Sequence, residues 1–246
     1  NALYVATTQA LASGDFAIAL GQSAKATAIR TIAQGFSATA QGNDSIAIGT
    51  GAVASGNRSI SIGYGNTVSG NNSGAFGDPS IILGANSFSV GNNNSIGATQ
   101  TGVFALGNNI TVTANNSVGL GSNAAMTTAL TTSSGGTTAV SSGTVGTITY
   151  GSFAGSTPVG VVSVGSVGAE RRIQNVAAGL IGASSTDAIN GSQLYVGLSV
   201  GQSTIASLST STSTGLSSVN SAVASLSTVT STGLSAVSST VASLST

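Results

Sequence analysis

The chain has 246 residues, of which 5 are Lys or Arg and 5 are Asp or Glu, while 35 are Gly and none is His, Cys or Trp. A formal net charge of zero argues against the basic surface that a nucleic-acid partner requires. Without His or Cys the usual catalytic triads and thiol nucleophiles are excluded, and scattered carboxylates offer no metal site. The composition therefore predicts no enzyme, no cofactor and no metal.

A glycine recurs every 14 residues through the first half of the chain. The positions one and three residues before it are mostly large and apolar, and the residue between them is small. Period-two alternation of this kind indicates a short strand with two different faces. Each period then predicts one coil of a β-solenoid, which is stable only in a stack. The glycines are Gly21, Gly35, Gly49, Gly63, Gly77 and Gly91 and, after two extra residues, Gly107 and Gly121.

A second alternating pair lies three and five residues after each glycine, and turn residues such as Gly42-Asn43-Asp44 separate the repeats. We expect large residues from one strand to meet small residues from the other inside the coil. The side chain four residues after each glycine should then be exposed, and we take this row as the predicted binding surface. Its members are Lys25, Thr39, Val53, Thr67, Ile81, Ser95 and Thr111.

Two other kinds of β-solenoid were compared with this pattern. A calcium-binding roll needs repeated Gly-Gly-x-Gly-x-Asp, whereas this region has only Asp15, Asp44 and Asp78 as acids. An ice-binding solenoid suits a flat face of Thr, but the exposed row mixes Lys, Thr, Val, Ile and Ser. Neither alternative is favoured.

Residues 127–160 are rich in Ser, Thr and Gly and break the period. After this segment, Glu170, Arg171 and Arg172 are adjacent charged residues, and we expect them to form the only cluster of charge in the protein. We interpret this cluster as inter-chain contacts that fix register rather than as a ligand site. Ser185 or Thr186 is expected to cap the next helix, with Asp187 in its first turn.

Past Asn190 the pattern changes to an 18-residue repeat that predicts a long helix. The apolar positions advance in steps of three and four that average about 3.6 residues, so the helices should be nearly straight. The outer faces are Ser and Thr, which are poor helix formers, so partners must stabilise the helix. The predicted core positions are Leu208, Thr212, Leu216, Val219, Val223, Leu226, Thr230, Leu234, Val237, Val241 and Leu244.

Two motifs resemble those of the YadA-like trimeric autotransporter adhesins. The first is Asp44-Ser45-Ile46-Ala47-Ile48-Gly49 followed by Ala52 and Ala54, which is similar to the family's head repeat. The second is the run Glu170 to Gly179 followed by Ser185 to Leu194, which is similar to the family's neck. The resemblance implies a left-handed parallel β-roll head, a neck and a trimeric parallel coiled coil. A membrane-anchoring domain would follow and is absent here, so we expect this chain to be part of a longer protein.

On this reading, the predicted fold is a mainly β head plus an α stalk in a homotrimer. We predict a head at 1–126, a head insert at 127–160, a neck at 161–190 and a coiled-coil stalk at 191–246. The neck residues expected to set register are Glu170, Arg171, Arg172, Asp187 and Asn190.

The resemblance also implies a function. We expect a virulence-associated adhesin on the outer-membrane surface of a Gram-negative bacterium, which binds host extracellular matrix protein or cell surfaces. The alternative is a structural trimeric fibre or spacer, like a phage tail spike, with no ligand of its own.

Overall fold

The structure is a computed structural model that describes residues 9–245; residues 1–8 of the predicted head and Thr246 of the predicted stalk lie outside the described residues. The chain divides into two compact units, Asn1–Gln174 and Asn175–Thr246. The boundary falls inside the segment predicted as the neck. Within residues 9–245, no helix is both long and apolar enough to cross a membrane.

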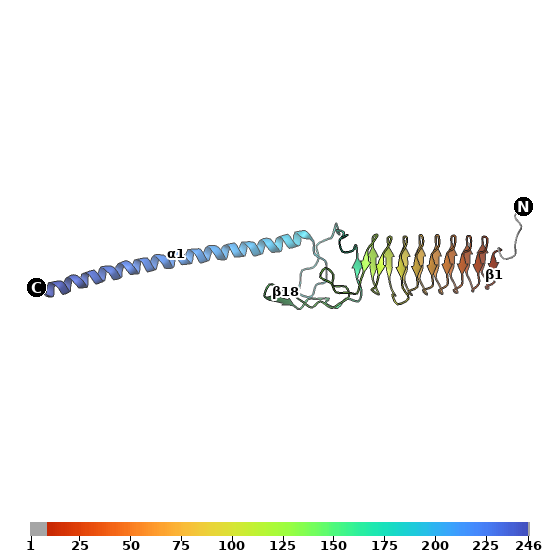
Figure 1. Ribbon diagram of the computed structural model, residues 1–246. Coiled ribbons are helices and arrows are strands. Elements are labelled where there is room, and N and C mark those ends of the chain that lie inside the picture. The colour runs from red at the N-terminus through yellow and green to blue at the C-terminus, as the bar shows by residue number, and fades with distance from the viewer. Residues whose placement is uncertain (1–8, 246) are drawn as a thin grey trace. The chain divides into compact units, whose positions relative to one another are not determined.

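The first unit is a parallel β-solenoid of about 8 turns, as predicted (Figure 1). One side of the stack is a nine-stranded sheet, here called the long-strand sheet, in which each strand pairs in parallel register with the strand one coil away. Its strands are β2 (Ile18–Leu20), β4 (Ile32–Gln34), β6 (Ile46–Ile48), β8 (Ile60–Ile62), β10 (Gly74–Phe76), β12 (Phe88–Val90), β14 (Phe104–Leu106), β16 (Val118–Leu120) and β20 (Val162–Ser163).

The other side of the stack, here called the short-strand sheet, consists of two-residue strands. Seven of them form one parallel sheet and two more form a separate pair. The seven are β1 (Leu11–Ala12), β3 (Lys25–Ala26), β5 (Thr39–Ala40), β7 (Val53–Ala54), β9 (Thr67–Val68), β11 (Ile81–Ile82) and β13 (Ser95–Ile96), and the pair is β15 (Thr111–Val112) and β17 (Ala125–Met126).

The small central residue of the long strand faces the inside of the coil, and its large pair faces outward. Ala47 is fully buried, whereas its neighbours Ile46 and Ile48 are only half-buried. Among the three-residue strands within residues 9–245, Ala19, in the first long strand, is the one central residue that is half-buried. In the later coils the large residues inside come from the short strand, and the fully buried ones are Val68, Ile82, Ile96 and Met126. Large and small residues therefore meet inside these coils as expected, but the long strand supplies the small ones.

The turns depend on residues that tolerate a positive φ. At equivalent places in four successive coils, φ lies between 53° and 60° for Asp44, Arg58, Asn72 and Asn86. Asx side chains also join the coils: the Asn57 Oδ1 accepts from the Asn43 backbone N–H at 3.1 Å. Short polar side chains favour this left-handed conformation. This explains why turns are rich in Asn.

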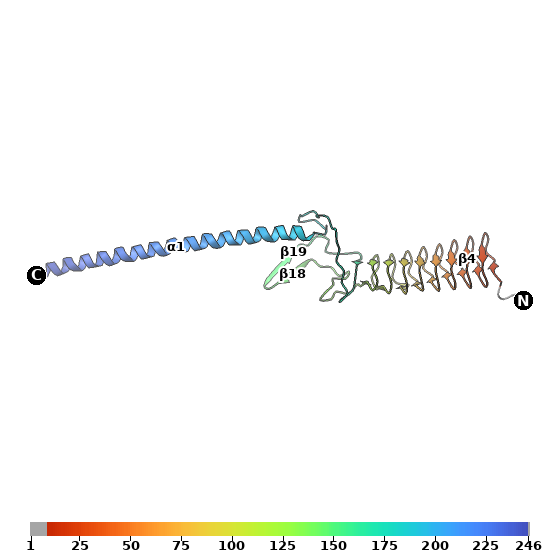
Figure 2. The same ribbon diagram turned by 90° about the horizontal axis from the view of Figure 1, so that it is seen from above.

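The predicted insert leaves the stack after β17 and returns to it at β20. It contains an antiparallel hairpin of β18 (Ser142–Val145) and β19 (Ile148–Gly151), which Figure 2 shows. Val162 then pairs with Val118, 44 residues earlier in the chain. The first residues of the predicted neck thus supply the last strand of the long-strand sheet.

The second unit ends in a single helix, α1 (Gly191–Leu244), of 54 residues, none of them buried. Asn190 caps it: its side chain accepts from the Gln193 backbone N–H, and the Gln193 side chain accepts from the Asn190 backbone N–H. The expected cap at Ser185 or Thr186 was wrong, and Asp187 lies before the helix rather than in its first turn. The capping box of Asn190 and Gln193 satisfies two helix donors at once, which a cap further upstream cannot do.

Candidate binding surface

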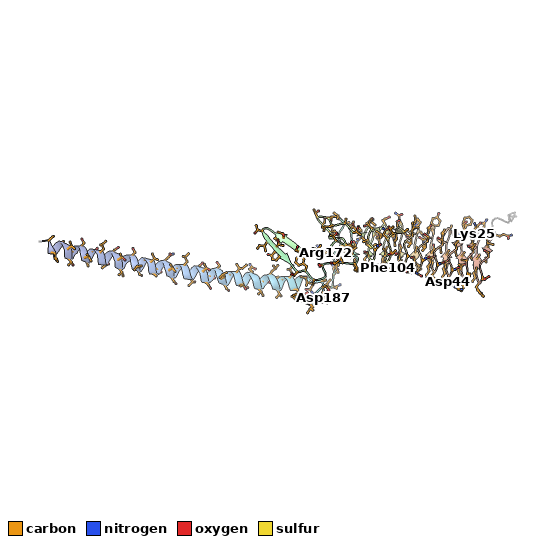
Figure 3. The ribbon with its side chains drawn as sticks, turned by 90° about the horizontal axis from the view of Figure 1, so that it is seen from below. Lys25, Asp44, Phe104, Arg172 and Asp187 are labelled. Carbon is orange, nitrogen blue, oxygen red and sulfur yellow. The ribbon has the colours of Figure 1, made fainter. Side chains whose placement is uncertain are left out.

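The predicted binding residues lie on the outer face of the short-strand sheet. Lys25 aligns with Thr39, and the same register continues coil by coil to Ser95. Thr111 follows in β15, on the far side of the break in this sheet. Lys25, Ile81, Ser95 and Thr111 are exposed, while Thr39, Val53 and Thr67 are half-buried. The surface is thus one row of unlike, mostly small side chains, and Figure 3 labels Lys25 at one end of it.

The outer face of the long-strand sheet has a different character. Nearly every coil presents two large apolar side chains there, in register along the sheet. Phe104, labelled in Figure 3, is 42% exposed although it is aromatic. Gln34 and Gly74 are the exceptions among the outward pairs. Continuous apolar surface of this kind marks a protein–protein contact.

One row of turns carries a column of charge that the sequence reading missed. Arg30 and Asp44, 14 residues apart, form an ion pair in which the Arg30 Nη2 lies 3.0 Å from the Asp44 Oδ2. One coil further, the Arg58 Nε donates to the Asn72 Oδ1 at 2.6 Å. The hydrogen bond from Arg30 lowers the pKa of the Asp44 carboxyl, and the charge of Arg58 adds to this effect. The 14-residue spacing of Arg30, Asp44 and Arg58 was the available signal, and the expectation of a single charge cluster was wrong.

At the end of the head, the predicted register residues make contacts within their own chain. The Arg171 Nη2 donates to the Ser122 carbonyl at 2.7 Å, and its Nη1 donates to the Val164 carbonyl at 2.6 Å. The guanidinium of Arg171 thus satisfies two backbone carbonyl oxygens at the end of the stack. The Glu170 carboxylate accepts from the Gly168 N–H at 2.9 Å, and this bond lowers the pKa of Glu170.

The other register residues organise the segment before α1. The Asp187 Oδ2 accepts from the Leu180 N–H at 2.9 Å, and the Asn190 Nδ2 donates to the Val176 carbonyl at 3.1 Å. Arg172 is exposed. Their predicted inter-chain role stays a prediction. In the part of the chain that the structure describes, no group of three or more acids could hold a metal ion.

Two family descriptions match this chain. The YadA head domain repeat matches residues 8–24, 12–33, 26–52 and 54–78, and the coiled stalk of trimeric autotransporter adhesin matches residues 172–228. Together they cover about half of the chain and agree with the solenoid and the helix. The chain belongs to the trimeric autotransporter adhesins. Members of this family are trimeric, surface-exposed passenger proteins with structural or adhesive rather than enzymatic roles.

Among solved structures, the chain is similar to the C-terminal YadA-like domain of a protein from Burkholderia pseudomallei. The two are 41% identical over 57% of this adhesin chain and 49% of that chain, with a TM-score of 0.33. This chain therefore spans about half the length of the solved one. No curated protein sequence matches it.

Proposed function

We propose that this chain is the adhesive part of a homotrimeric fibre on the outer-membrane surface of a Gram-negative bacterium. The outer face of the short-strand sheet binds host extracellular matrix protein or a cell surface. The observation that supports this proposal is the contrast between the two outer faces of the head. The outer face of the long-strand sheet is apolar, which suits burial between copies of the chain. The outer face of the short-strand sheet is mixed and more polar, which suits exposure to solvent and contact with a partner.

Burial of the apolar face gives the trimer a driving force. Burying apolar surface is worth about 25 cal/mol per Å², and most strands of the long-strand sheet carry the apolar pair. Helix α1 has the same requirement, since none of its residues is buried in one chain. Both units therefore gain stability from the same association.

Adhesion through a solenoid face relies on repetition. The same strand position recurs in every coil and again in each of three copies, so weak contacts add by avidity. The row carries one charge, Lys25, so attachment should change little with salt.

The test is to coat the whole chain on a surface and to measure attachment of collagen, fibronectin, laminin and cultured cells. A triple variant with Thr39, Thr67 and Ser95 each changed to Asp removes the row, while Ser225→Asp on the helix is the control. Loss of attachment in the triple variant alone supports the proposal. If the unchanged chain attaches to nothing, the structural-fibre reading replaces ours.

A further inference from the structure

The hydrogen-bond ladder of the short-strand sheet is interrupted at one place in the stack, between β13 and β15. Before the break, the Ile81 N–H donates to the Asn94 carbonyl at 2.9 Å, and the Leu83 N–H donates to the Ile96 carbonyl at 2.8 Å. After the break, the Thr111 N–H donates to the Ala124 carbonyl at 3.0 Å. The coils on both sides are thus regularly paired.

At the break itself, the equivalent groups do not meet. The donors would be the N–H groups of Ser95 and Gly97, and the acceptors would be the carbonyls of Ile110 and Val112. Within residues 9–245 no backbone hydrogen bond joins these donors to these acceptors. Unpaired backbone groups need a partner, from water or from a ligand.

The cause is the pair of extra residues between Gly91 and Gly107. They form a turn in which the Gln100 N–H donates to the Gly97 carbonyl at 3.1 Å. The long-strand sheet is unaffected, because Phe88 still pairs with Phe104 in register. The stack therefore keeps its backbone ladder on one side and loses it on the other, where the Ile110 N–H donates to the Asn94 Oδ1 at 2.8 Å instead.

A cavity of about 450 Å³ lies at this break, which we call the inter-coil slot. Such a volume lies within the range of about 300–1,000 Å³ usual for ligand pockets. Amide and hydroxyl side chains line most of the slot, whereas Ile110, which is 3% exposed, and the half-buried Val112 belong to the core of the coil. No charged residue lines it. Its lining is Asn93, Ser95, Gly97, Gln100, Asn109, Ile110, Thr111 and Val112.

We propose that the inter-coil slot binds a short segment of a neutral, hydroxyl-rich glycan. A sugar that lies across the mouth of the slot can direct single hydroxyls, each the size of a water molecule, between the coils. Such hydroxyls both donate and accept, so they can pair with the N–H groups of Ser95 and Gly97 and with the carbonyls of Ile110 and Val112. This inference rests on the proposed adhesive role of the short-strand sheet and gives that face a ligand class.

A peptide strand fits the slot less well. A strand inserted between β13 and β15 needs about 4.8 Å on each side, which doubles the spacing of the two flanking strands. The paired strands β12 and β14 hold the same two coils one strand spacing apart. A charged ligand is also disfavoured, because no Lys or Arg lines the slot. Both exclusions point to a small neutral group.

The test uses saturation-transfer NMR on the whole chain. Lactose and N-acetyllactosamine represent animal glycans, and dextran represents bacterial polysaccharide. The unchanged chain should transfer magnetisation to ring protons of at least one of these sugars, and the one that responds identifies the source.

Two variants locate the site. Thr111→Tyr fills the slot and should weaken sugar binding by about tenfold or more, while Leu11→Tyr, at the same strand position in a regularly paired coil, should not. Deletion of Ala98 and Thr99 restores the 14-residue period and should also remove the signal. Circular dichroism shows whether each variant keeps its fold.

The inference is overturned if no sugar receives magnetisation, or if Thr111→Tyr and Leu11→Tyr behave alike. Attachment of the unchanged chain to matrix or cells without any sugar signal overturns the slot alone and leaves the proposed function intact. Sugar binding without attachment to matrix or cells overturns the proposed function and leaves the slot.

Discussion

The head and the helix differ in how many side chains they bury within one chain. Each head coil buries a core of its own side chains, and every buried side-chain nitrogen or oxygen among residues 9–245 has a hydrogen-bond partner. Helix α1 buries nothing within one chain. Its Ser and Thr hydroxyls bond back to the carbonyl four residues earlier, as Thr212 does to Leu208 at 2.9 Å.

The difference shows where each unit gets its folding free energy. The head has a core within one chain, whereas the helix has none there and, in the trimer that we propose, depends on association. Hydroxyl back-bonds satisfy polar groups but slightly destabilise a helix. Substitutions inside the head should therefore act on the coil itself, and substitutions on the helix seam should act on the assembly.

The largest effect is expected from a charge on the helix seam. Val223→Asp places an uncompensated charge at a predicted core position, which costs about 3–5 kcal/mol per buried charge. The helix should unfold and the trimer should dissociate, as read by circular dichroism and sedimentation. Ser225→Asp, on the opposite side of the helix, is the control. Equal effects of the two variants would show that α1 has no buried seam.

Within the head, two neighbouring residues of β11 give a matched comparison. Ile82 is fully buried and Ile81 is 48% exposed. Ile82→Ala should lower the free energy of unfolding by about 2–5 kcal/mol, because it leaves a cavity in the coil. Ile81→Ala should lower it by less than about 1 kcal/mol. Denaturant unfolding measures both, and a reversed order would mean that the coil faces are assigned the wrong way round.

The next largest effect on stability is expected at the glycines that follow each long strand. Gly49 has φ +122°, and a Cβ there would overlap the Gly63 carbonyl of the next coil. Gly49→Ala should cost about 1–3 kcal/mol from backbone strain, and the clash adds to it. Gly51 has φ +66°, and a Cβ there would meet the Gly65 Cα only at an ordinary contact distance of 3.9 Å, so it should accept Asn with little change. Thermal unfolding compares them, and tolerance of Gly49→Ala would contradict the close approach of the coils.

The smallest effect concerns the charge column. The pKa of Asp44 is lowered in the folded chain, chiefly by its hydrogen bond from Arg30. Its stabilisation is therefore present above the unfolded value of about 3.9 and is lost as pH falls through the lower folded value. In the unchanged chain, the thermal unfolding temperature should therefore fall as the pH is lowered. Asp44→Asn should remove this fall, while Asp15→Asn should keep it. If the unfolding temperature of Asp44→Asn depends on pH as that of the unchanged chain does, the ion pair does not contribute to stability in solution.

The sequence alone predicted the solenoid, because a 14-residue spacing repeats both the strand and its turn. It could not predict which strand face lies inside, because alternation separates two faces without ordering them. The pairing of Val162 with Val118 was missed because the insert hides the period. The cap at Asn190 was missed because Ser185 and Thr186 offer the same chemistry nearby, and only the geometry of Gln193 decides between them.

The central claim is that three heads meet through the long-strand sheet and present the short-strand sheet outward. The chain has no Cys, so one introduced thiol carries one spin label per copy. Gln34→Cys and Thr39→Cys place labels on the two outer faces of a single coil. Dipolar EPR should give a shorter distance between copies for position 34 than for position 39. A shorter distance at position 39, or no coupling at either position, would contradict the account.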